Sequence, residues 1–193
     1  MSGMRLLIVP GLHDSGPTHW QSWLQALHRG ALRVQQRDWT DPQLDRWAAR
    51  VASTLERAGP GPCIAVAHSF GCLALARHLE LQRDSPISAA LFVAPAEPDK
   101  FGVADLLPRQ PLAIASTVIA SDTDPWMSAA SARRWAQRWG SHVINLGDAG
   151  HINAESGFGP LPFARRWVLA MEQRTARERR PRHANFSEWS FAV

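Results

Sequence analysis

The stretch GPCIAVAHSFGCLALARHL, residues 61–79, decides the fold class. An apolar run over 63–67 ends in His68-Ser69-Phe70-Gly71, and a pattern with helical period follows. This order predicts a buried strand, a sharp turn and a helix, with a serine at the turn. Two roles are open for Ser69 from this stretch alone: a nucleophile exposed at a strained turn, or the N-cap of the helix.

The turn requires small residues two positions before and two positions after the serine, where backbones crowd. Gly71 satisfies one requirement, and Ala67 is one methyl larger than the usual glycine. The helix that begins at about Phe70 directs its first N–H groups toward the turn, where they stabilise negative charge. The Phe70 amide is therefore the first expected oxyanion donor.

Apolar runs alternate with helical patterns along the rest of the chain. Alternation of this kind predicts a mostly parallel sheet with helices on both faces, a three-layer α/β fold. Asp41 is expected to cap one helix, with Pro42 at its first position. We expect six strands in the spatial order 2-1-3-4-5-6 and no lid domain. The expected strands cover 6–9, 32–35, 63–67, 89–94, 116–120 and 142–146, and the helices outside the opening stretch cover 19–29, 41–59, 128–140 and 161–174.

The length of 193 residues favours one domain, which we place at 1–173, followed by a basic, poorly ordered tail at 174–193. Residues 174–183 hold five Arg and one Glu, which accounts for the whole net charge of +4. The rest of the chain is balanced, so no basic groove for nucleic acid is indicated. The tail is either a solvated terminus or a contact for an acidic protein partner.

Composition excludes several other classes. The apolar stretch before Pro10 is too short for the core of a secretion signal, about 7–15 residues, so we expect a cytoplasmic protein. No run approaches the ~18 apolar residues of a membrane span. Cys63 and Cys72 fall in predicted core segments and are expected to be buried thiols. No Cys/His cluster has zinc spacing, and we expect neither a metal nor a cofactor.

Reactive residues follow four of the predicted strands. They are Ser69, the pair Asp122 and Asp124, His151, and the Gly11-Leu12 turn. The carboxyl ends of parallel strands share one edge of a sheet, so these residues are expected to converge. In isolation each has a structural alternative, such as a loop histidine or a helix-capping aspartate.

Together they predict a catalytic triad in the chain order Ser, Asp, His. His151 is the expected base for Ser69, and Asp124 is the expected acid. Asp122 is expected to bond loop amides or cap a turn. The Leu12 amide is the second expected oxyanion donor. Three further residues are expected to bind substrate, two of them with packing as the alternative role: His13, His68 and Trp126.

Four segments together resemble the small lidless α/β-hydrolases of the retinoblastoma-binding-protein-nine/YdeN-like group. They are IVPGLHDSGPTHWQSWL, VAHSFGCLALARHL, ASDTDPW and LGDAGHIN. The resemblance covers residues 5–172 and implies an α/β-hydrolase fold with the same triad. It also implies a structural role for His19 and Trp20 near the site. Ala67 and the basic tail depart from the family pattern.

The resemblance implies a serine hydrolase that acts on small carboxylic esters or related acyl compounds. The missing lid implies a small, open pocket and short-chain substrates. Two alternatives remain open. One is amidase-, peptidase- or thioesterase-type hydrolysis at the same site, and the other is a non-catalytic protein-binding module on a hydrolase scaffold.

Overall fold

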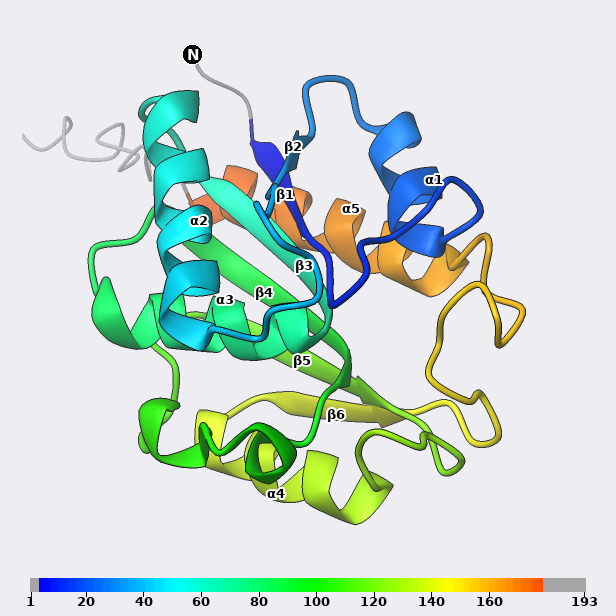
Figure 1. Ribbon diagram of the computed structural model, residues 1–193. Helices are drawn as coiled ribbons and strands as arrows, with labels where there is room; N and C mark the ends of the chain where they lie inside the picture. Colours follow the sequence, from blue (N-terminus) through cyan, green and yellow to red (C-terminus); the bar gives the residue numbers. More distant parts are fainter. Residues whose placement is uncertain (1–3, 179–193) are drawn as a thin grey trace, which may run out of the picture.

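The computed structural model describes residues 4–178 (Figure 1). Strands and helices alternate along the chain, as the apolar pattern predicts, and the order is β1 (Arg5–Val9), α1 (Trp20–Leu27), β2 (Leu32–Arg33), α2 (Leu44–Ala58), β3 (Cys63–Ser69), α3 (Phe70–Leu81), β4 (Ile87–Pro95), the 3-10 turns η1 (Pro98–Phe101) and η2 (Ala104–Leu106), β5 (Ala115–Ala120), α4 (Ala129–Trp139), β6 (His142–Asn145) and α5 (Pro162–Glu178).

The six strands form one sheet in the order β2-β1-β3-β4-β5-β6, and every neighbouring pair is parallel. The predicted fold class and strand order are confirmed. Since β1 and β3 are neighbouring parallel strands, the loops that follow them meet at one edge of the sheet. This topology places the turn after β1 beside Ser69.

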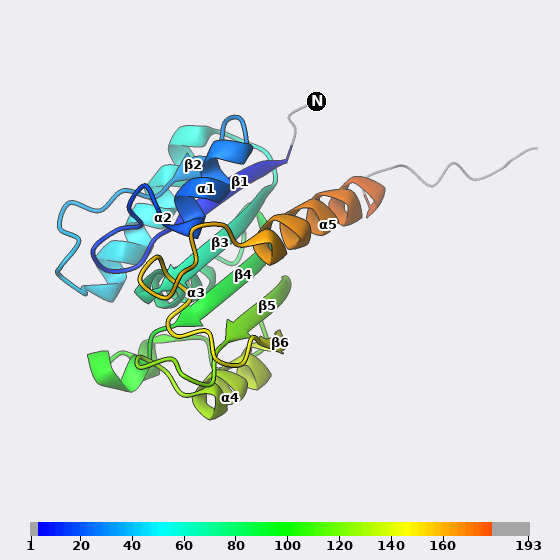
Figure 2. The same cartoon turned by 90° about the vertical axis from the view of Figure 1, so that its right-hand side faces the viewer.

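Helices cover both faces of the sheet (Figures 1 and 2). Alternate residues of β1 enter two different cores, since side chains of a strand point to opposite faces. Leu7 and Val9 belong to the core that also contains residues of α2, α3 and α4, whereas Leu6 and Ile8 belong to the core that contains residues of α1 and α5. The three-layer arrangement follows from strands that are apolar on both faces.

Several element boundaries differ from the expectation, and the contacts explain two of them. Helix α2 begins at Leu44, with Gln43 as its N-cap, rather than after an Asp41 cap. The Asp41 carbonyl accepts hydrogen bonds from the Gln43 amide at 2.9 Å and from the Trp47 indole at 2.8 Å, which holds 41–43 in a separate turn. Strand β2 ends at Arg33, because the Gln35 carbonyl is bonded to Arg50 and not to the sheet.

The last helix is longer than expected. Helix α5 continues to Glu178, through the first five residues of the segment predicted as a tail. Arg174 and Glu178 stand four positions apart and pair at 2.9 Å, which supports this last helical turn. Residues 179–193, the remainder of that segment, lie outside the described residues. None of the helices within 4–178 has the length and apolar character needed to cross a membrane.

Candidate active site

Ser69 lies at the junction of β3 and α3, in a backbone conformation that residues other than glycine rarely adopt. Its backbone has φ 54° and ψ −128°, and its side chain makes no capping bond to the helix. Ser69 thus occupies the N-cap position of α3, but its hydroxyl does not cap the helix. The neighbouring strand bulges at the same level, since His68 pairs with Val93 but Ser69 pairs with Pro95, and the extra residue Ala94 has φ 45°. This bulge lets the chain turn sharply and leaves Ser69 partly exposed.

Two glycines make room for the turn. A Cβ on Gly71 would collide with the carbonyl oxygens of Val9 and Pro10. A Cβ on Gly11 would lie 2.7 Å from the Ser69 Cβ. The loop after β1 therefore packs directly against the serine turn. Ala67 is fully buried within β3 and is accommodated in the usual glycine position.

Replacing Gly71 with alanine is expected to lower the free energy of unfolding by about 1–3 kcal/mol, because the added methyl meets backbone and not a flexible side chain. Urea unfolding measures this difference. The matched control is Gly16→Ala, since a Cβ at Gly16 has no neighbour within 4 Å. Equal stability of the two variants would contradict the packing described here.

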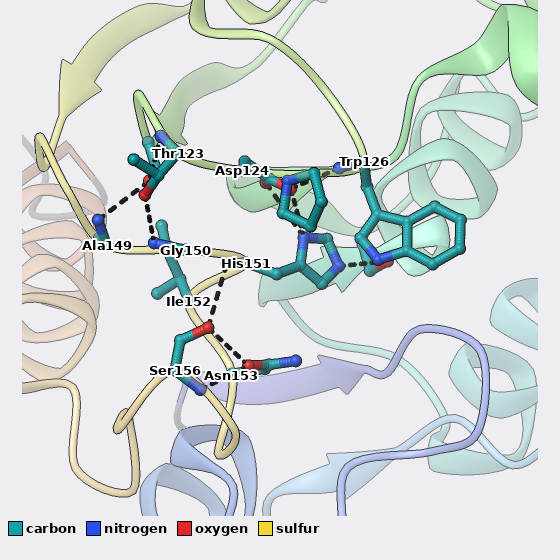
Figure 3. Close-up of polar contacts among 12 residues, drawn as sticks. Thr123, Asp124, Trp126, Ala149, Gly150, His151, Ile152, Asn153 and Ser156 are labelled. Carbon is teal, nitrogen blue, oxygen red and sulfur yellow. Dashed lines mark hydrogen bonds and ion pairs between the residues drawn. The ribbon is translucent and has the colours of Figure 1, made fainter.

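His151 is carried by a loop after β6 that hydroxyl groups hold in place (Figure 3). The hydroxyl of Ser121 accepts the Ala149 amide at 3.1 Å, and that of Thr123 accepts the Gly150 amide at 3.0 Å. The Ser156 hydroxyl accepts the His151 amide at 3.2 Å. Three side chains thus satisfy three successive loop amides, which fixes the position of the imidazole ring.

The imidazole of His151 links Ser69 to Asp124. Its Nε2 lies 2.9 Å from the Ser69 hydroxyl oxygen, and its Nδ1 lies 2.9 and 3.0 Å from the two Asp124 oxygens. A carboxylate only accepts, so Nδ1 carries the proton and Nε2 accepts from the serine O–H. The Asp124 side chain is only 2% exposed, which excludes competing water from this pair.

Asp122 points elsewhere. Its carboxylate accepts a hydrogen bond from the Asn145 amide at 2.7 Å, and its own backbone amide is bonded to Gly147. The Asp124 carboxylate makes a second hydrogen bond, because its Oδ1 also accepts the Trp126 backbone amide at 2.8 Å. This bond fixes the turn and directs the carboxylate toward His151. Of the two aspartates, only Asp124 lies in contact with the histidine.

Ser69 is followed by Phe70, whose ring is buried between Trp47 and Phe101 of η1, at centroid distances of 5.1 and 4.9 Å. Within residues 4–178, the amides of Phe70 and Leu12 donate no hydrogen bond to other groups. Both stand where the β1 loop meets the serine turn.

The three residues expected to bind substrate differ in position. Trp126 is 45% exposed and its ring lies 6.2 Å from that of His151, with the Lys100 ammonium 5.6 Å above its centroid. His13 is exposed, and its backbone amide is bonded to Trp39. His68 is buried and contacts the His151 loop from inside the protein, so the packing alternative describes it.

Two buried histidines stand behind His151. The ring of His68 lies 4.8 Å from that of His151 and 4.8 Å from that of His19. Burial, followed by the positive charge of Arg33, lowers the pKa of His19 to about 4. Burial also lowers the pKa of His68 well below its usual value. Both rings are therefore neutral at physiological pH.

Neither cysteine offers an alternative nucleophile. Cys63 and Cys72 are free and buried, as expected. Burial raises the pKa of the Cys63 thiol to about 12 and that of Cys72 well above its usual value, so neither is a thiolate nucleophile. Across the described part of the chain, no group of three His, Cys, Asp or Glu side chains could hold a metal ion.

Sequence reasoning missed the residues that support the loop after β1. The buried amide of Gln21 donates to the carbonyls of Val9 and Val66, which ties α1 to the end of β1 and the middle of β3. Arg33 donates to Asp14 and to the Ser15 carbonyl, both at 2.6 Å. A glutamine within a helix whose neighbours are apolar was the only signal for the first of these.

A parallel sheet in this order, with a serine at a strained strand-to-helix turn and a histidine-aspartate pair at the same edge, defines the α/β-hydrolase class. The chain matches the sequence model of the serine hydrolase family over residues 6–171. It therefore belongs to the serine hydrolase family. The resemblance to YdeN-like hydrolases seen in the sequence is confirmed by solved structures.

A protein described as a YdeN-like hydrolase, from Pectobacterium atrosepticum, is 37% identical, with a TM-score of 0.82 over 89% of this chain and 91% of that one. The ydeN gene product of Bacillus subtilis is 21% identical, with a TM-score of 0.73 over 90% and 100%. The esterase RhEst1 from Rhodococcus is 14% identical, with a TM-score of 0.63 over 90% of each chain, and shares the fold. No curated protein matches the chain.

Proposed function

We propose that the protein hydrolyses small carboxylic esters through an acyl-enzyme on Ser69. The observation that carries this proposal is the hydrogen-bonded chain from Ser69 through His151 to Asp124. In this geometry one imidazole nitrogen accepts the serine proton, while the other donates to a shielded carboxylate that stabilises the resulting imidazolium.

The first half-reaction forms the acyl-enzyme. The Ser69 oxygen attacks the ester carbonyl carbon while its proton passes to His151 Nε2. The carbonyl oxygen gains the negative charge and accepts hydrogen bonds from the Leu12 and Phe70 amides. The intermediate collapses, the bond to the alcohol oxygen breaks, and His151 returns its proton to the departing alcohol.

The second half-reaction releases the acid. Water attacks the acyl carbon and gives one proton to His151, and the amides again stabilise the oxyanion. The bond to the Ser69 oxygen then breaks and the proton returns to that oxygen. The products are a carboxylic acid and the free enzyme, and no cofactor takes part in either half-reaction.

An open site favours small substrates. Only two 3-10 turns and their connecting loops stand between β4 and β5, and Trp126 is exposed beside His151. A cavity of about 560 Å³ lies along α2 instead, lined by Gln36, Arg37, Trp47, Arg50 and neighbours, and it does not include the triad. We expect the acyl group to be held beside the exposed Trp126, and not in a deep apolar channel.

A series of p-nitrophenyl esters from acetate to decanoate tests both the reaction and the site. Each methylene that enters an apolar pocket is worth about 1–3 kcal/mol of discrimination, so without such a pocket kcat/KM is expected not to rise beyond butyrate. Hydrolysis is followed by nitrophenolate release. A steady rise toward decanoate would contradict the open site, and no turnover of any ester beyond the background rate would contradict the esterase proposal.

The same assay applied to matched amides and thioesters separates the related hydrolytic reactions. We expect the ester to react faster than the amide, because an alcohol is a better leaving group than an amine. The thioester is compared relative to its own uncatalysed rate, because a thiol leaves more readily than an alcohol. A higher kcat/KM for the amide would assign the protein to amide hydrolysis and overturn the ester proposal.

A further inference from the structure

The backbone that carries His151 is strained. Gly150 has φ 53° and Ile152 has φ 48°, on either side of the histidine. Positive φ is a true outlier for a β-branched residue such as Ile152, and it persists only where surrounding contacts enforce it. Figure 3 shows these residues in succession along the loop. The hydroxyl bonds described above hold the amides that precede and include His151, but not the carbonyls that follow.

Two buried side chains hold those carbonyls. The Nε2 of His68 lies 3.0 Å from the His151 carbonyl oxygen, and the indole Nε1 of Trp20 donates to the Ile152 carbonyl at 2.8 Å. They come from different elements, since His68 precedes the serine in β3 and Trp20 opens α1. Trp20 is fully buried and His68 is 5% exposed, so water does not replace either donor.

The surroundings of His68 and of the neighbouring His19 fix the protonation state of both rings. A carbonyl only accepts, so His68 carries its proton on Nε2. The Nδ1 of His19 accepts the Gln21 amide at 3.1 Å and therefore carries no proton. Burial keeps both rings neutral, as the lowered pKa values show. No positive charge thus stands 4.8 Å behind the ring that becomes an imidazolium in the proposed reaction.

We propose that His68 and Trp20 are positioning residues, which clamp two successive carbonyls so that His151 Nε2 stays in hydrogen-bond reach of Ser69. This inference rests on the proposed function. The inference gives Trp20, of the His19-Trp20 pair, a role in catalysis that acts through His151, in addition to its role in packing. Neither side chain touches the substrate.

The first test compares His68→Leu with His68→Gln. Leucine removes the donor at similar volume, and the glutamine amide can still donate to the carbonyl. We expect His68→Leu to lower kcat for p-nitrophenyl acetate about 10²-fold, the cost of a misplaced catalytic group, with KM unchanged. His68→Gln is expected to recover most of that loss.

The matched control is His78→Leu. His78 is also a buried histidine, with its pKa lowered to about 4 by burial, and its ring bonds Ser85 away from the site. We expect it to lower the melting temperature as much as His68→Leu does, while kcat stays at the wild-type value. An equal loss of kcat in both variants would mean that His68 affects kcat only through the stability of the fold, and it would overturn the proposal.

Trp20→Phe gives an independent test, with Trp167→Phe as its control, since the Trp167 indole donates to Thr117 on the far part of the sheet. Trp20→Phe is expected to lower kcat and its control is not. In a His151→Ala background, His68→Leu and Trp20→Phe should cause no further loss, because both act through His151. A further loss in that background would overturn the positioning role.

The wild-type rate separates this inference from the proposed function. If the wild type hydrolyses no ester, the proposed function fails. If the wild type is active and His68→Leu and Trp20→Phe keep its kcat, only the clamp is wrong.

Discussion

Replacement of Ser69 by alanine is expected to lower kcat for ester hydrolysis by about 10⁶-fold, the loss seen when a triad nucleophile is removed. The hydroxyl supplies the attacking oxygen, and neither cysteine can replace it, since the thiols of Cys63 and Cys72 are buried and protonated. The decrease is measured as initial rates of p-nitrophenyl acetate hydrolysis against the uncatalysed rate.

The control for this variant is Ser88→Ala. Ser88 is a partly buried serine in β4 whose hydroxyl donates to the Cys63 carbonyl at 3.2 Å, away from the site. It is expected to keep the wild-type kcat. Ser69→Ala is expected to unfold at the same temperature as the wild type, because the Ser69 hydroxyl bonds only His151 among the described residues. Activity of Ser69→Ala within tenfold of the wild type would rule out the acyl-enzyme.

The second large effect separates two aspartates that stand two positions apart. Asp124→Asn is expected to lower kcat by about 10⁴-fold, because an asparagine amide in that position favours the wrong tautomer of the histidine. His151 Nδ1 would then face an N–H donor, and its Nε2 would carry the proton and no longer accept from Ser69. The pre-steady-state rate of acylation measures the effect directly.

Asp122→Asn is the matched control, since the charge change is the same. Asp122 bonds Asn145 and not His151, so its replacement is expected to leave kcat near the wild-type value. If Asp122→Asn were the more damaging substitution, the assignment of the acid to Asp124 would be wrong.

The sheet could be predicted because its central strands β1, β3, β4 and β5 are short, mostly apolar runs that are buried within the sheet. Strands that are apolar on both faces pack in a parallel sheet between two layers of helices. The right-handed crossover rule then leaves few possible strand orders. The approach of Ser69, Asp124 and His151 to one another follows from the same rule, since residues after parallel strands share an edge.

Sequence position favours Asp124 over Asp122 as the partner of His151, but the physical reason is the turn geometry, which is visible only in the structure. Asp124 contacts His151 because its carboxylate also holds the Trp126 amide, which sets the direction of the side chain. The start of α2 was predicted wrongly because Asp41-Pro42 has the composition of a helix start, and the carbonyl of Asp41 is instead taken by the Trp47 indole.

The support behind the histidine could not be predicted, because it depends on contacts between residues far apart in the chain. Trp20 and Ile152 are 132 positions apart, and His68 and His151 are 83 apart. Neither the position of Trp20 in its helix nor that of His68 beside Ser69 indicates which distant residue each one contacts. The same is true of Gln21, whose amide joins two neighbouring strands, β1 and β3.

The central claim is that Ser69 is the nucleophile, and covalent labelling tests it most directly. The protein is incubated with a fluorophosphonate, and the adduct is located by intact mass and peptide mapping of the wild type, Ser69→Ala and Ser88→Ala. We predict one phosphonyl group per chain on Ser69 in the wild type and in Ser88→Ala, and none in Ser69→Ala. An unlabelled wild type, or a label that remains in Ser69→Ala, would contradict the account.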